Sequence, residues 1–73
     1  MKIKDEGKIM FKKYIKTIEN SEYEIEVHKS GYANVRKDGK FFSHTTSIYS
    51  ALQSIYQQLD NAVYLELDSF SEV

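Results

Sequence analysis

The side chains that could carry chemistry are few in this sequence. His28 and His44 are the only histidines, and there is no cysteine. Ser43, Ser47 and Ser50 lie close to His44 in the sequence. A serine nucleophile, however, needs a positioned base and a third group that orients the base, and the spacing provides no such set. We therefore expect that the protein is not an enzyme.

The best candidate for a metal site is a short run of alternating residues. Glu24, Glu26 and His28 would lie on one face of a strand, with Arg36 on a neighbouring strand. Such a row is more often an ion-paired surface than a metal site, so we expect neither a metal nor a cofactor. The acidic row has two interpretations. It pairs with the nearby basic residues, or it presents a negative stripe to a basic partner.

Length and composition set limits on the class of protein. The chain has 73 residues, which corresponds to one domain over 1–73, with 1–7 expected to be mobile. The lack of cysteine favours a cytoplasmic location, and no apolar run approaches the roughly 20 residues that span a bilayer. The formal net charge is −1, which provides no overall field for holding nucleic acid or an anionic membrane.

The charges are unevenly distributed along the chain. Residues 1–16 carry six lysines against two acids, whereas residues 41–59 contain no Asp, Glu, Lys or Arg. Charged residues make up 29% of the chain, so the uncharged stretch is a distinct feature.

The first expected element is a helix over residues 8–20. Its apolar stripe recurs at the helical period and consists of Phe11, Tyr14, Ile15 and Ile18. A strand from Ile9 to Ile18 is the alternative, and it would place Lys13 among apolar residues.

Three antiparallel strands follow, over residues 22–28, 32–37 and 41–44. A loop ending at Gly31 and a two-residue turn at Asp38–Gly39 connect them. These loops pair Val27 with Ala33, Ile25 with Val35, Val35 with Phe42 and Arg36 with Phe41. The resulting apolar face holds Tyr23, Ile25, Val27, Ala33, Val35 and Phe42. The other face holds the rows Glu24–Arg36–Phe41, Glu26–Asn34–Ser43 and His28–Tyr32, and His44 is placed near the apolar face.

A second helix follows the strands. Thr45, Thr46 or Ser47 caps it, and its buried stripe is Ile48, Leu52, Ile55 and Leu59, with Ala51 beside it. Residues 62–70 fit a strand and a helix equally well. The expected fold is α+β with the order α-β-β-β-α: a three-stranded antiparallel sheet, helices on one face, and a tail that is a fourth strand or a further helix.

Two groups of side chains are candidates for partner binding. Tyr32, Arg36 and Phe41 would cluster on the polar sheet face, where a partner, the tail or a second copy of the chain could cover them. Tyr49, Gln53 and Tyr56 would form the outer stripe of the uncharged helix, either as an interface or as flanks of the core. Glu24 and Glu26 complete the candidate partner-binding set.

The sequence resembles two families. The order α-β-β-β-α and the stretch Val35-Arg36-Lys37-Asp38-Gly39-Lys40 before a helix resemble a double-stranded-RNA-binding domain. The second resemblance is to phage anti-CRISPR proteins that inhibit type II CRISPR nucleases. It is carried by residues 14–27, interpreted as an opening helix that runs into a strand, and by the same hairpin. The second resemblance implies a small inhibitor that binds a larger protein.

We therefore expect a non-enzymatic partner-binding module, an anti-CRISPR-like phage or mobile-element inhibitor or regulator of a larger host protein. A homodimer is a further expectation, and a membrane partner is not expected. The alternative is a nucleic-acid-binding domain that uses the N-terminal lysines with Arg36, Lys37 and Lys40.

Overall fold

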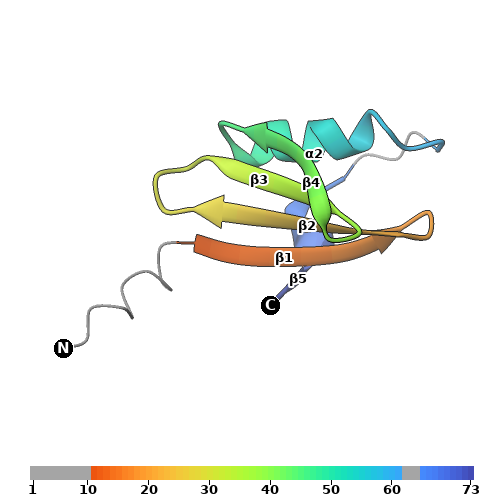
Figure 1. Ribbon diagram of the computed structural model, residues 1–73, viewed down its shortest axis with the longest axis horizontal. Coiled ribbons are helices and arrows are strands. Elements are labelled where there is room, and N and C mark those ends of the chain that lie inside the picture. Colours follow the sequence, from red (N-terminus) through yellow and green to blue (C-terminus); the bar gives the residue numbers. More distant parts are fainter. Residues whose placement is uncertain (1–10, 62–64) are drawn as a thin grey trace.

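The computed structural model describes residues 11–61 and 65–73. Their main element is a five-stranded antiparallel sheet with the order β4-β3-β2-β1-β5 (Figure 1). The strands are β1 (Phe11–Ile18), β2 (Ser21–His28), β3 (Ala33–Lys37), β4 (Lys40–Thr45) and β5 (Ser71–Glu72). The other elements are the helix α2 (Ile48–Tyr56) and the 3-10 helix η1 (Leu67–Ser69). The predicted α-β-β-β-α fold with a three-stranded sheet is therefore wrong.

Within the predicted helix over residues 8–20, the structure describes residues 11–20, which form the strand β1 and the turn that follows it. β1 pairs with β2 along its whole length, through a turn at Glu19–Asn20 in which both residues have positive φ, 51° and 70°. Tyr14 and Ile18 pack against the core, four residues apart. A spacing of four places residues on the same face of a helix and also on the same face of a strand. The apolar pattern alone therefore could not distinguish the two structures.

The predicted pairing of the next strands is largely confirmed. Val27 pairs with Ala33, Ile25 with Val35, and Arg36 with Phe41. The predicted Val35–Phe42 pair is wrong, because a bulge lies between Val35 and Arg36 and Val35 pairs with Ser43. The extra residue is on β4, and it moves the side chains that follow it to the opposite face from the one predicted.

Phe42 lies on the apolar face, as predicted, and packs against the core with its ring edge-on to Tyr23 at a centroid distance of 6.1 Å. The bulge changes the pairing of the residues that follow Phe42 on β4. The row predicted as Glu26–Asn34–Ser43 ends at His44 instead, because Asn34 pairs with His44.

The helix α2 agrees with its prediction. The Ser47 hydroxyl caps it by accepting from the backbone N–H of Ser50 at 3.1 Å. Ala51 and Ile55 are fully buried, Leu52 and Leu59 pack against the core, and Ile48 is half-buried. α2 contacts β4, β3 and β2, so it covers that part of one sheet face.

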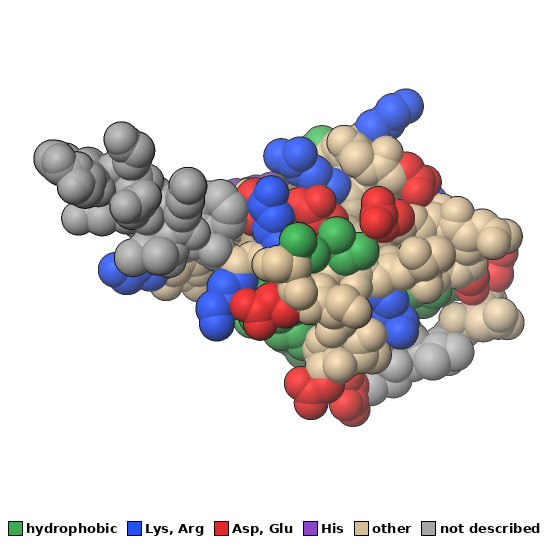
Figure 2. All heavy atoms as spheres, turned by 90° about the horizontal axis from the view of Figure 1, so that it is seen from below, with side chains coloured by type: hydrophobic (Ala, Val, Ile, Leu, Met, Phe, Trp, Pro, Cys, Tyr) green, Lys and Arg blue, Asp and Glu red, His purple; other side chains and the backbone are tan. Residues whose placement is uncertain are grey.

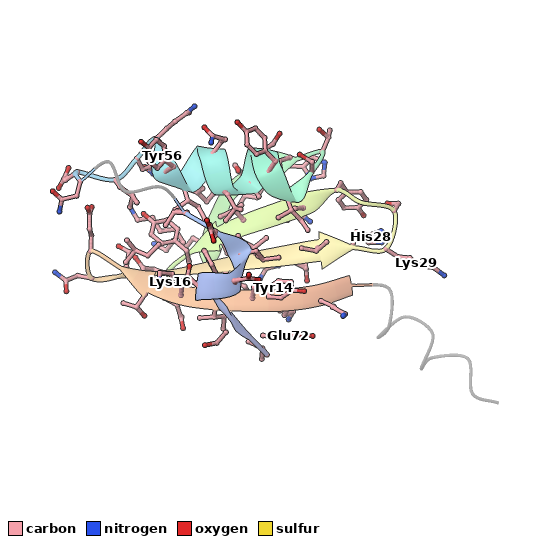
Figure 3. The ribbon with its side chains drawn as sticks, turned by 180° about the vertical axis from the view of Figure 1, so that it is seen from behind. Tyr14, Lys16, His28, Lys29, Tyr56 and Glu72 are labelled. Atoms are coloured by element: carbon pink, nitrogen blue, oxygen red, sulfur yellow. The ribbon has the colours of Figure 1, made fainter. Side chains whose placement is uncertain are left out.

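The tail completes the cover on the same face. Residues 62–64 lie outside the described residues; from Leu65 onward the chain forms η1 and then β5, which pairs with β1. This is neither the single strand nor the single helix predicted for residues 62–70. Leu65 and Phe70 are buried in the core. Seen from behind, α2 and η1 lie across the same side of the sheet, and Lys16 Nζ donates to the carbonyl of Ser69 at 3.4 Å (Figure 3).

The Glu19 side chain links the turn between β1 and β2 to the residues that follow α2 through hydrogen bonds. Its carboxylate oxygens accept from the backbone N–H groups of Asp60 and Asn61, both at 3.0 Å. These two hydrogen bonds, with a smaller contribution from Lys37, lower the pKa of Glu19 below its ordinary value. A carboxylate with a lowered pKa stabilises the fold above its ordinary pKa, and this contribution is lost as the pH falls through the lowered pKa.

The turn between β3 and β4 provides a test of the register. Gly39 has a φ of 82°, and no atom lies within 4 Å of the position that a Cβ would take. We expect Gly39→Val to lower the free energy of unfolding by about 1–2 kcal/mol, because a β-branched residue is strained at positive φ. Thermal or denaturant unfolding measures this difference. Gly39→Asn is the matched control and should cost less, because Asn tolerates this backbone conformation; an equal stability of Gly39→Val and the wild type would contradict this turn.

Candidate protein interface

One face of the sheet faces away from α2, and we call it the open face. The strand registers place its residues in rows that cross the sheet from β5 to β4. One row contains Ser71, Ile15, Glu24, Arg36 and Phe41. The next contains Lys13, Glu26, Asn34 and His44.

Five of the eight residues predicted to bind a partner lie on the open face. Phe41 and Arg36 are direct neighbours on β4 and β3, and Glu24 lies on the far side of Arg36 on β2. Glu26 lies in the adjoining row, and Tyr32 stacks on His28 at the end of the face. Phe41, Arg36, Glu24 and Glu26 therefore lie in adjoining rows, and Tyr32 lies apart from them, beside His28.

Phe41 is a large apolar side chain on this surface. It is 74% exposed, although phenylalanine is among the residues most often buried. Arg36 beside it is also exposed. The tail, which was one of the predicted covers, lies on the opposite face, where Leu65 and Phe70 are buried.

A row of three rings borders the open face. His28 stacks on Tyr32 at a centroid distance of 4.4 Å and an angle of 9°, and the Tyr32 ring lies 5.3 Å from that of His44. His44 Nδ1 is hydrogen-bonded to the Asn34 side chain, and His28 Nδ1 lies 3.0 Å from the Ser30 hydroxyl. The prediction that His44 lies near the apolar face is wrong, because the bulge moves it to this side. No sequence pattern revealed the bulge.

Charged side chains on the open face lie opposite residues of the other charge on the neighbouring strand. Lys13 of β1 lies opposite Glu26, and Arg36 of β3 lies opposite Glu24. This arrangement favours the first interpretation of the acidic row, in which it is balanced by basic neighbours. Toward β1 and β5 the surface has the same mixed character, with apolar side chains between acidic and basic ones (Figure 2).

The predicted stripe on α2 is divided between solvent and core. Tyr49 is 65% exposed, whereas Gln53 is half-buried. Tyr56 packs against the core cluster, so it is one of the residues that hold α2 on the sheet (Figure 3). The stripe therefore does not form a single exposed contact surface.

Within residues 11–61 and 65–73 no pocket is found, and no group of three or more His, Cys, Asp or Glu residues is placed to hold a metal ion. No helix in the described part of the chain has the length and apolar character needed to cross a membrane.

Comparisons of the chain with protein-family models, curated proteins and solved structures found no match.

The two helix tyrosines provide a test of this division. We expect Tyr56→Ala to lower the free energy of unfolding by more than about 1 kcal/mol, because it removes a ring that packs against the core. Tyr49→Ala should change it by less than about 0.5 kcal/mol, as is usual for exposed residues. Parallel denaturant unfolding of the two variants measures the contrast. Equal stability of the two variants would show that the tyrosines have equivalent environments.

Proposed function

We propose that the protein is a non-enzymatic binding module whose open face contacts a partner protein. The observation that carries this proposal is the 74% exposure of Phe41 beside the exposed Arg36, on the sheet face that no helix in residues 11–61 and 65–73 covers. Aromatic residues and arginine are enriched at the centres of protein interfaces, where they contribute most of the binding energy.

The surface has the features of a small contact patch. Phe41 provides apolar area that a pocket in the partner could remove from water, and Arg36 provides several hydrogen-bond donors in a fixed arrangement. Glu24 and Glu26 add acceptors next to these groups. Because the basic and acidic residues alternate across the strands, the patch has no excess of one charge. It therefore suits a partner surface of mixed polarity better than a strongly charged one.

We further propose that binding inhibits or regulates a larger host protein. The predicted resemblance to anti-CRISPR proteins suggested this role, but it assigned residues 14–20 to an opening helix, and residues 14–18 belong to β1. The proposal therefore rests on the open face and not on that resemblance.

Nucleic acid binding is the rival function. The predicted double-stranded-RNA-binding order begins with a helix, but residues 11–18 form the strand β1, and the lysines of β1 alternate between the two faces of the sheet. Lys37 and Lys40 lie opposite each other at the β3–β4 turn, and Lys37 Nζ lies 5.7 Å from the centre of the Tyr23 ring. Two lysines at one turn provide only a small electrostatic contribution to phosphate binding.

The open face can be tested with immobilised protein. Wild type, Phe41→Ala and Arg36→Ala should be compared for the proteins that each retains from a lysate of the source organism, followed by calorimetry with the purified partner. We expect each substitution to weaken binding at least tenfold, which is about 1.4 kcal/mol. Gln58→Ala is the matched control, because Gln58 is exposed but follows α2 on the other side of the sheet. A partner that binds all the variants equally would contradict the proposed surface.

The same samples distinguish the rival function. At physiological salt the wild type should show no measurable affinity for duplex RNA or DNA. A micromolar affinity that falls in the Lys37→Ala, Lys40→Ala double variant, together with a steep dependence on salt, would favour nucleic acid over a protein partner.

A further inference from the structure

The uncharged stretch of the sequence folds into one side of the molecule. Residues 41–59 contain no Asp, Glu, Lys or Arg, and they include β4 from Phe41 onward, all of α2 and the residues that follow it. α2 contacts β4 more than any other strand and lies along the β4 side of the sheet (Figure 1). We call this surface, made of the outer edge of β4 and the neighbouring side of α2, the neutral side.

The two edges of the sheet are built differently. β5 forms one edge with only two residues, beside Lys12, whose Nζ lies 4.0 Å from a carboxylate oxygen of Glu72. β4 forms the other edge with six residues, and within the described residues no strand pairs with its outer side. Natural proteins usually protect a long edge with lysine, proline or a bulge. Here Lys40 and the bulge lie toward one end of β4, and the part from Ser43 to Thr45 carries neither a charge nor a proline.

The side chains of the neutral side are self-complementary. His44 and Thr46 are exposed, and Ser50 and Gln53 are half-buried. Hydroxyl, amide and imidazole groups both donate and accept hydrogen bonds, whereas lysine only donates and a carboxylate only accepts. The same surface on a second molecule therefore provides matching donors and acceptors, and it brings no like charges together.

We propose that the partner of the neutral side is a second copy of this chain, joined by antiparallel pairing of the two β4 strands across a two-fold axis. An antiparallel pair of identical strands places the same residues on both sides of such an axis, which is the arrangement of most homodimers. The two sheets become one continuous sheet, and the α2 helices of both copies lie on the same side of it. Both open faces then lie together on the other side. The inference does not depend on what the open face binds.

Charge substitutions at His44 test this pairing. His44 is exposed and lies close to the middle of the uncharged part of β4. Glutamate or lysine at this position would face its own copy near the axis, and like charges in adjacent strands repel. We expect the wild type to form dimers as its concentration is raised, at or below about 1 mM. His44→Glu and His44→Lys alone should each weaken the dimer at least tenfold, and an equimolar mixture of the two should restore it, as measured by sedimentation equilibrium.

Two matched variants control the experiment. Thr17→Lys adds a charge to an exposed position of β1, away from β4, and should leave the dimer unchanged. The chain has no cysteine, so His44→Cys introduces a single thiol that should form an intermolecular disulfide under mild oxidation much faster than Thr17→Cys does. Circular dichroism and thermal unfolding confirm that each variant is folded.

Each remaining result contradicts the proposal. A wild type that stays monomeric over the whole concentration range would show that the neutral side does not bind its own copy. A dimer that persists in both His44 variants would have a different interface. Folded monomeric variants that are not rescued by mixing would show that His44 does not lie near a two-fold axis between the strands.

Discussion

The fold depends on burying apolar side chains on only one face of the sheet. Ile25 and Val35 are paired neighbours on β2 and β3, and both are fully buried together with Ile55 of α2. A slip of one residue in this pairing would turn Glu24 and Glu26 toward the core, where an unpaired carboxylate is costly. The position of every residue on the open face therefore follows from the packing on the other face.

This constraint separates the structural residues from those free to bind. Tyr23 and Ala33 continue the buried surface, and the tail closes it with Leu65 and Phe70. The alternating residues of the same strands carry no such packing role, which leaves them free for recognition. Phe41 belongs to this second set, because its side chain is 74% exposed and is not part of the core cluster. The open face and the neutral side meet at β4, so this one strand contributes to both proposed contacts.

The sequence predicted elements correctly where local signals were unambiguous. Gly31 set the pairing of β2 with β3, Asp38–Gly39 set the pairing of Arg36 with Phe41, and Ser47, one of three predicted caps, caps α2. β1 was missed because the spacing of Tyr14 and Ile18 fits a helix as well as a strand, and Glu19 is an unusual residue for a turn with positive φ. Pairing with β2, a contact distant from the local pattern, decided between them.

The candidate site was predicted in part for the same reason. Arg36 and Phe41 were paired correctly because the turn was correct, whereas Tyr32 lies beside His28 and His44, four residues before Arg36 in the chain. His44 was misplaced because a bulge has no sequence pattern of its own here. Tyr56 was assigned to the outer side of α2, but the core reaches far enough around the helix to include it.

The central claim is that one sheet face is covered and the other is open to solvent. Nuclear magnetic resonance with a soluble paramagnetic agent tests it directly on dilute protein, because broadening of a resonance reports how closely the agent approaches. The side-chain resonances of Phe41 should broaden strongly, while those of Val35 and Ile55 should be largely unaffected. If Phe41 were protected as well as Val35, another part of the chain would cover this face, and the open face would not be a binding surface.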